Sequence, residues 1–183
     1  MDMEKIKVCF CCHGNICRSP MAEFYLKDLV LKEGIADQFH IESAATTSEE
    51  IWNGRGNPVY PPAREVLLRH GIDPSGKRAR LMTRGDYQLF DYLIGMDDEN
   101  LYDMHRICGG DPMGKISLLM DWVDWQERGR LAPGQGRSVA DPWYTRNFEA
   151  TWDDIVQGCQ AFFSYVGKMR QNQLFPVSDR EEG

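Results

Sequence analysis

The sequence predicts a single doubly wound α/β domain, in which a central four-stranded parallel sheet has helices on both faces. The first observation is that short apolar runs alternate along the chain with segments of helical periodicity, as a parallel sheet requires. The second is size, because 183 residues with 42% hydrophobic content can build one substantial core. We therefore expect one domain over residues 1–170, followed by a polar tail over 171–183.

Glycine and proline mark the element boundaries in the first half of the chain. Gly34 follows one segment with helical spacing of apolar residues, and Gly71 follows another. Pro61 and Pro62 suit the first turn of the second helix. The first half is therefore predicted to hold, in order, a strand over 5–11, a helix over 20–32, a strand over 39–44, a polar loop over 45–57 and a helix from Pro61 to His70.

The second half continues the alternation with shorter elements. The sequence Asp-Pro-Ser-Gly at 73–76 is typical of a turn. The stretch 121–140 is rich in glycine and charge, so we expect an irregular, lid-like loop there. The remaining elements are predicted to be, in order, a short helix over 83–88, a strand over 90–96, a helix over 98–106, a strand over 115–120 and a closing helix over 147–168.

Charge and cysteine content limit the function classes. A formal net charge of −7 argues against a nucleic-acid or an anionic-membrane partner. The sequence shows no apolar run long enough to span a bilayer and no secretion signal at its start. Four of the six cysteines stand at 9, 11, 12 and 17, a clustering that favours catalytic or redox thiols over a disulfide framework. We therefore expect a cytoplasmic protein.

The segment from Cys12 to Ser19, which reads Cys-His-Gly-Asn-Ile-Cys-Arg-Ser, joins the first apolar run to the first helix. Backbone N–H groups of such a loop can converge on an anion, and the positive end of the helix adds to their field. Gly14 permits a close turn, and the planar fork of Arg18 matches two phosphoryl oxygens. The same field favours the thiolate form of Cys12. The segment therefore predicts a phosphate-binding loop that contains a nucleophile.

This loop, which continues Pro-Met-Ala-Glu, resembles the signature loop of the low-molecular-weight protein tyrosine phosphatases. The resemblance runs from about Lys5 to about Lys168 and implies a flavodoxin-like fold. It also implies hydrolysis of phosphotyrosine and other aryl phosphate monoesters through a cysteinyl-phosphate intermediate. The expected substrate is a phosphotyrosine-bearing protein or a small aryl phosphate, and the product is inorganic phosphate. No cofactor and no metal is expected, and the protein should be a monomer or a weak dimer.

The leaving group of such a reaction must be protonated as it departs. Aspartates that precede proline are candidates, because proline fixes the backbone of the residue before it. Asp73, Asp111 and Asp141 are equally eligible on local chemistry. The resemblance selects Asp141, because the acid of the family stands in an Asp-Pro pair followed by two aromatic residues, here Trp143 and Tyr144.

The resemblance also assigns supporting roles. The side chains expected to form the phosphate-binding loop beside Cys12 and Arg18 are His13, Gly14, Asn15, Ile16, Cys17 and Ser19. The hydrogen-bond network that holds this loop open would consist of Asn15, Ser19, Ser43 and His70. From the residues alone, His70 would instead be a solvated cap of a helix C-terminus. Cys17 resembles the thiol that forms a reversible disulfide with the nucleophile, although a small buried apolar residue is an equal interpretation.

The rim of the pocket departs from the family pattern. Glu49 stands where the family usually has an aromatic residue, and Trp52, in what looks like an insertion, is a candidate to replace it. Trp143 and Tyr144 are the other candidates for a wall that stacks on an aryl ring. A carboxylate at position 49 would repel acidic phosphopeptides.

Four alternatives were weighed. An arsenate reductase of the same fold needs further cysteines in the second half of the chain, where only Cys108 is near. A phosphoarginine phosphatase would carry threonine where this chain has Ile16. A phosphate-binding module has no use for a nucleophilic thiol. A zinc site formed by Cys9, Cys12, His13 and Cys17 lacks a second ligand pair at the usual spacing. The sequence therefore favours a metal-free cysteine phosphatase.

Overall fold

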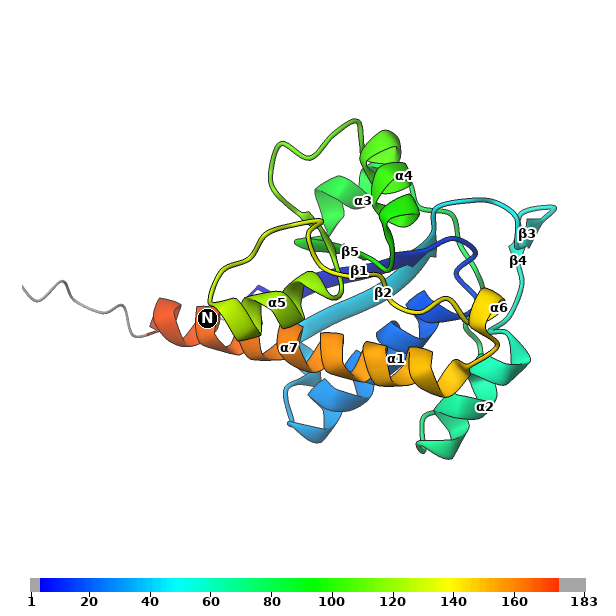
Figure 1. Cartoon of the computed structure of the whole chain (residues 1–183), viewed down its shortest axis with the longest axis horizontal. Coiled ribbons are helices and arrows are strands. Elements are labelled where there is room, and N and C mark those ends of the chain that lie inside the picture. The colour runs from blue at the N-terminus through cyan, green and yellow to red at the C-terminus, as the bar shows by residue number, and fades with distance from the viewer. Residues whose placement is uncertain (1–3, 175–183) are drawn as a thin grey trace, which may run out of the picture.

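A four-stranded parallel sheet forms the centre of the computed structural model, which describes residues 4–174 (Figure 1). Its strand order is β2-β1-β5-β6, and all three pairings are parallel. The strands are β1 (Ile6–Cys12), β2 (Phe39–Ala45), β5 (Tyr92–Gly95) and β6 (Ile116–Leu118). The register pairs Cys12 with Ala45, so β1 and β2 end level with each other. The predicted four-stranded parallel sheet is confirmed.

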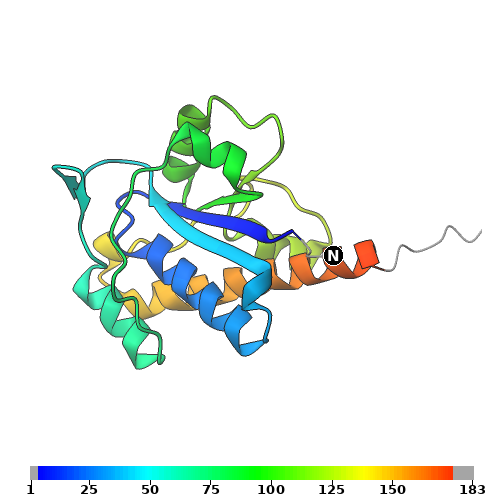
Figure 2. The same ribbon diagram turned by 180° about the vertical axis from the view of Figure 1, so that it is seen from behind.

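Helices cover both faces of this sheet (Figures 1 and 2). One face carries α1, α5 and α7, with α2 packed against α1 and α7, and the other face carries α3 and α4. Their bounds are α1 (Arg18–Lys32), α2 (Pro61–Arg69), α3 (Arg84–Leu89), α4 (Asp98–Cys108), α5 (Asp121–Arg128) and α7 (Phe148–Leu174). Two short elements complete the set, a 3₁₀ turn η1 (Ala36–Gln38) and α6 (Pro142–Thr145). The doubly wound α/β prediction is confirmed.

Strand β1 divides its side chains between the two layers. Val8, Phe10 and Cys12 belong to the core shared with α1, α2 and α7, whereas Cys9 and Cys11 belong to the core shared with α3 and α4. All five side chains are buried. Because successive side chains of a strand point to opposite faces, Cys12 leaves the strand on the α1 side. This periodicity directs its thiol toward the start of α1.

The predicted irregular loop over 121–140 is wrong in its first part. Residues 121–128 form α5, which packs against α7, and only the segment from 129 to 141 is irregular. Trp122 is buried with its ring centroid 5.1 Å from that of Phe162. Gly129 ends the helix in the left-handed conformation, with φ 74°. The apolar side chains of α5 find their partners on α7, a contact that local composition does not reveal.

Two further boundaries differ from the prediction. The loop over 45–57 contains a small hairpin, β3 (Ile51–Trp52) and β4 (Arg55–Gly56), which stands out from the body of the molecule (Figures 1 and 2). Its two-residue turn is Asn53-Gly54, both with positive φ, as a hairpin of this length prefers. Helix α7 continues to Leu174, so residues 171–174 are helical rather than part of a tail. The rest of the predicted tail lies outside the described residues.

No helix in the range 4–174 combines the length and the apolar character that crossing a membrane requires.

Candidate active site

Cys12 is the last residue of β1, and its thiol lies at the N-terminus of α1. The Sγ atom is 3.0 Å from Ser19 Oγ, and the backbone N–H of Ser19 donates to Sγ at 3.4 Å. The side chain is almost fully buried, with 3% exposed. A thiol that faces a helix N-terminus and hydrogen-bond donors is stabilised as the thiolate. The structure therefore gives Cys12 the surroundings of a nucleophile.

Asn15 orders the loop from beneath. Its Nδ2 group donates to Ser19 Oγ and to Ser43 Oγ, both at 2.8 Å, and its Oδ1 accepts from the backbone N–H of Arg80 at 3.1 Å. Asn15 also takes the left-handed turn of the loop, with φ 58°. Since Ser19 Oγ accepts a hydrogen bond from Asn15, its own hydroxyl hydrogen is free to point at Cys12. This direction suits a thiolate.

Gly14 serves a purpose other than the expected turn. Its φ is not positive, and a Cβ atom at this position would lie 2.9 Å from Cγ of Glu50. The glycine therefore allows the loop to pack closely against the segment after β2.

A buried ion-pair cluster continues the network behind Ser43. Ser43 Oγ donates to Glu23 Oε1 at 2.7 Å, and Glu23 is nearly buried within α1. Lys77 Nζ lies 3.3 Å from Glu23 Oε1 and donates to the backbone oxygen of Ser43 at 3.0 Å. Lys27 reaches the other oxygen of Glu23 at 3.0 Å. Sequence reasoning missed Glu23 and Lys77, because they meet only when the chain after α2 returns past α1.

The expected role of His70 in this network is wrong. His70 follows the last residue of α2, is exposed, and stacks on the ring of Trp152 with centroids 4.6 Å apart. The cap interpretation from the residues alone was the better one. Lys77 takes the place expected for His70, because the turn after α2 carries its ammonium group back toward Ser43 and Glu23.

Arg18 closes the pocket beside the thiol, with 4% of its side chain exposed. Its Nη1 donates to Asp97 Oδ2 at 2.6 Å, and its Nη2 lies 3.2 Å from Asp141 Oδ2. Burial lowers the pKa of Arg18, but the negative charges of Cys12, Asp97 and Asp141 outweigh that effect and raise it. The guanidinium therefore stays charged. Asp97, which the sequence analysis missed, also caps α4 by accepting from the backbone N–H of Asn100 at 2.8 Å.

Asp141 is the aspartate of an Asp-Pro pair that lies in the pocket. It precedes α6 with an extended backbone, φ −86° and ψ 111°, and its Oδ1 accepts from the backbone N–H of Trp143 at 3.0 Å. The other two aspartates make local structure elsewhere. Asp73 accepts from the backbone N–H of Ser75, and Asp111 accepts from the hydroxyl of Tyr87 at 2.7 Å. Neither is among the pocket residues.

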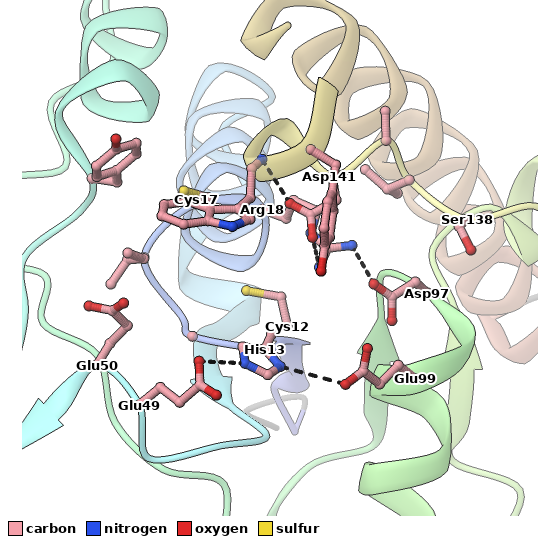
Figure 3. Close-up of a pocket in the computed structure, with 17 residues that line it drawn as sticks. Cys12, His13, Cys17, Arg18, Glu49, Glu50, Asp97, Glu99, Ser138 and Asp141 are labelled. Carbon is pink, nitrogen blue, oxygen red and sulfur yellow. Dashed lines mark hydrogen bonds and ion pairs between the residues drawn. The ribbon is translucent and has the colours of Figure 1, made fainter. Parts of the chain in front are cut away.

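The pocket above Cys12 has a volume of about 710 Å³ (Figure 3). Trp143 and Tyr144 line it with 61% and 82% of their surfaces exposed, as expected of a rim. Trp52, on the β3–β4 hairpin, is 71% exposed and is not among the residues that line the pocket, so its role at the rim stays a prediction. Tyr60, which the sequence analysis missed, lines the pocket and binds Ile16 O through its backbone N–H at 2.8 Å.

His13 and Glu49 lie on the opposite side of the mouth. His13 Nε2 is 2.8 Å from Glu49 Oε2, and His13 Nδ1 is 3.9 Å from Glu99 Oε1 (Figure 3). The imidazole thus lies between a carboxylate that follows β2 and one that belongs to α4.

The remaining thiols differ in their access to the pocket. Cys17 lines it, and burial together with the charges of Cys12 and Asp141 raises the pKa of Cys17, so this residue remains a thiol. Burial raises the pKa of Cys108 to about 11 and that of Cys159 as well. Neither of these two lines the pocket. Across residues 4–174, no three His, Cys, Asp or Glu side chains are grouped so that they could hold a metal ion.

Comparisons with known proteins point to one family. The family model of the low molecular weight phosphotyrosine protein phosphatases matches residues 7–172. A low molecular weight protein-tyrosine-phosphatase of Bacillus subtilis is 37% identical over 166 residues, which cover 91% of this chain and 99% of that protein. The human low molecular weight phosphotyrosine protein phosphatase is 36% identical, with 85% of this chain and 92% of that protein covered.

Solved structures show the same similarity. The crystal structure of the Bacillus subtilis protein YfkJ superposes on this chain with a TM-score of 0.81 at 34% identity. The superposition covers 92% of this chain and 99% of the YfkJ chain. A Drosophila arginine phosphatase superposes on this chain with a TM-score of 0.72 at 27% identity. The superposition covers 88% of this chain and 98% of the Drosophila chain.

Proposed function

The chain belongs to the low-molecular-weight phosphotyrosine protein phosphatases, and we propose that Cys12, Arg18 and Asp141 perform its reaction. The protein is a protein tyrosine phosphatase, a phosphoric monoester hydrolase, and its substrates are phosphoproteins or aryl phosphates. The single observation that supports the residue assignment is the convergence of a thiol, a guanidinium and an aspartate in one pocket, with Arg18 Nη2 3.2 Å from Asp141 Oδ2.

The first chemical step transfers the phosphoryl group to Cys12. Its thiolate attacks phosphorus, an S–P bond forms, and the bond between phosphorus and the aryl oxygen breaks. Asp141 gives its proton to the departing aryl oxygen. Arg18 exchanges its contacts with Asp97 and Asp141 for two equatorial phosphoryl oxygens, whose charge it stabilises together with the N–H groups of the loop.

The second step returns the enzyme to its starting state. Asp141, now ionised, accepts a proton from water, and the water oxygen attacks phosphorus as the S–P bond breaks. Inorganic phosphate leaves, and Cys12 is again a thiolate that accepts from Ser19. Because the thiolate must be ionised while Asp141 is protonated, the rate of the first step should be highest at mildly acidic pH and fall in alkaline solution.

Five other features belong to the proposal. We place the protein in the cytoplasm, because the nucleophilic thiol requires a reducing compartment. The phosphatase domain extends to Leu174, the end of α7, and a monomer or a weak dimer is sufficient, because the thiol, the guanidinium and the aspartate come from one chain. Inorganic phosphate is the product. Oxidation by a peroxide would join Cys12 and Cys17 in a disulfide that a thiol reductant reopens.

The assignment is tested by the hydrolysis of p-nitrophenyl phosphate with EDTA present. The native protein should turn the substrate over, and Cys12→Ser should lose the activity by several orders of magnitude, because a hydroxyl is a far weaker nucleophile at neutral pH. Thioredoxin-coupled arsenate reduction and phosphoarginine hydrolysis are measured alongside. Turnover that survives in Cys12→Ser, or arsenate reduction without phosphatase activity, would contradict the proposal.

A further inference from the structure

The mouth of the pocket is strongly acidic even though its substrate is an anion. The pocket residues include five carboxylates, on Glu49, Glu50, Asp97, Glu99 and Asp141. The cationic side chains among them are Arg18 and, when it is protonated, His13. A phosphotyrosine that enters brings further negative charge, so the mouth opposes an acidic substrate and favours one that carries a compensating cation.

Three of these carboxylates already have a partner within the protein. Asp97 and Asp141 face Arg18, at 2.6 and 3.2 Å. Glu50 Oε2 accepts from Asn57 Nδ2 at 2.7 Å. These carboxylates serve the guanidinium and the packing of the loop.

Glu49 and Glu99 are different. Their side chains are 68% and 73% exposed, and they flank the same imidazole, at 2.8 and 3.9 Å from its two nitrogens. One imidazolium cannot neutralise two carboxylates, and a neutral imidazole has an N–H on only one nitrogen. Glu49 faces His13 through Oε2 and Glu99 through Oε1, which leaves the second oxygen of each for a partner from outside.

We propose that Glu49 and Glu99 are specificity residues, which select phosphotyrosine substrates with a lysine or arginine next to the phosphotyrosine. This proposal rests on the phosphatase function proposed above. His13 follows the nucleophile directly in the chain, so a cation that pairs with the second oxygen of Glu49 or of Glu99 lies close to the entering phosphotyrosine (Figure 3). An ammonium or guanidinium group there would complete the pairing that His13 leaves incomplete. An acidic neighbour would be repelled by both carboxylates.

The experiment compares phosphotyrosyl peptides that differ only in the residue beside the phosphotyrosine, which is lysine, glutamine or glutamate. At low ionic strength, kcat/KM of the native protein should be about tenfold higher for the lysine peptide than for the glutamate peptide, and the ratio should shrink as salt screens the mouth. In the double variant Glu49→Gln with Glu99→Gln, the ratio should fall severalfold, because the lysine peptide loses its partners and the glutamate peptide is no longer repelled.

The matched control removes two carboxylates far from the mouth, with Glu33→Gln after α1 and Glu127→Gln on α5. This variant has the same net charge as the test variant and should keep the native ratio. Equal kcat/KM for the three peptides in the native protein would overturn the inference. An unchanged ratio in the mouth variant, or an equal loss in the control, would do the same. Hydrolysis of p-nitrophenyl phosphate by the native protein separates the two proposals, because its absence would contradict the phosphatase assignment itself.

Discussion

At the scale of the single residue, Asp141 both caps a helix and contacts the guanidinium of the pocket. It precedes Pro142, begins α6 and points its carboxyl at Arg18. The same restriction of the backbone before proline acts on Asp73 and Asp111, yet Asp73 accepts from Ser75 in its own turn, and Asp111 accepts from Tyr87 of α3 and from the backbone of Lys115. Location in the fold, and not the dipeptide, separates an acid candidate from an ordinary turn.

Replacing Asp141 by alanine should slow hydrolysis most for substrates whose leaving group depends most on protonation. We expect kcat for phenyl phosphate to fall by roughly 10²–10⁴-fold, the usual contribution of general acid catalysis, while p-nitrophenyl phosphate, whose phenolate leaves more easily, slows less. Steady-state kinetics with a series of aryl phosphates measures this. Asp111→Ala is the control, and a leaving-group effect in that variant would transfer the role of the acid to Asp111.

At the scale of the element, the segment from 129 to 141 is fixed to the rest of the domain at several points. The buried carboxylate of Asp121 accepts from the backbone N–H groups of Leu118, Gly134 and Gly136, each at 2.7 Å. Further along, Asp154 of α7 accepts from the backbone N–H of Ala140, next to Asp141, at 3.1 Å. The segment has no regular secondary structure over most of its length, but its hydrogen bonds describe an anchored loop rather than a free lid.

The hydrogen bonds of Asp154 to this loop make the stability of the fold depend on pH. Burial raises the pKa of Asp154, but hydrogen bonds from Arg137 and from the backbone of Ala140 prevail and lower it. A carboxyl whose pKa is lower in the folded state stabilises the fold above its unfolded value of about 3.9, and the contribution is lost as the pH falls through the folded value. Asp154→Asn should therefore cost about 1–2 kcal/mol at pH 7, the range for a hydrogen bond to a charged group after allowance for the exposed Arg137.

Urea unfolding of the native protein and of Asp154→Asn, followed from pH 7 to pH 3, measures this contribution. The difference in the free energy of unfolding should be constant near neutral pH and narrow below about pH 4. Glu33→Gln, a change at an exposed carboxylate, is the control and should leave the free energy of unfolding nearly unchanged. A difference for Asp154→Asn that stayed the same at pH 3 would show that the ionised carboxylate is not what holds the loop.

At the scale of the whole molecule, two helical layers enclose the sheet, and the lower one in Figure 1 depends on aromatic packing. Trp122 of α5 lies against Tyr92, Phe162 and Tyr165, with ring centroids 4.8 to 5.8 Å apart. These contacts join the sheet, α5 and α7 into one core, to which Cys12 at the end of β1 also belongs.

Trp122→Ala should therefore destabilise the domain by roughly 3–5 kcal/mol, because it removes a large buried side chain and leaves a cavity. Trp52→Ala makes the same chemical change at the exposed hairpin and should stay within about 0.5 kcal/mol of the native protein. Chemical denaturation of both variants gives the comparison. Equal effects of the two substitutions would show that α5 is not part of the cooperative core.

The sequence by itself determined the order of the four strands of the main sheet and of helices α1, α2, α3, α4 and α7, and it proposed the phosphate-binding loop, the nucleophile and its arginine, because these depend on short-range patterns. Apolar periodicity, glycine and proline act on neighbouring residues, and Cys12, Arg18 and Ser19 lie within one loop and one helical turn. The choice among three Asp-Pro pairs required the family resemblance, because local chemistry made them equal.

Only the tertiary structure decided which distant side chains meet at that loop. It joined Glu23 and Lys77 to the network in place of His70, placed Asp97 against Arg18, and brought Glu99 to the same imidazole as Glu49. It also formed α5 in a stretch whose composition predicts a loop. Each of these contacts joins segments that are far apart in the chain, and its free energy comes from burial and charge pairing that exist only once the sheet has brought those segments together.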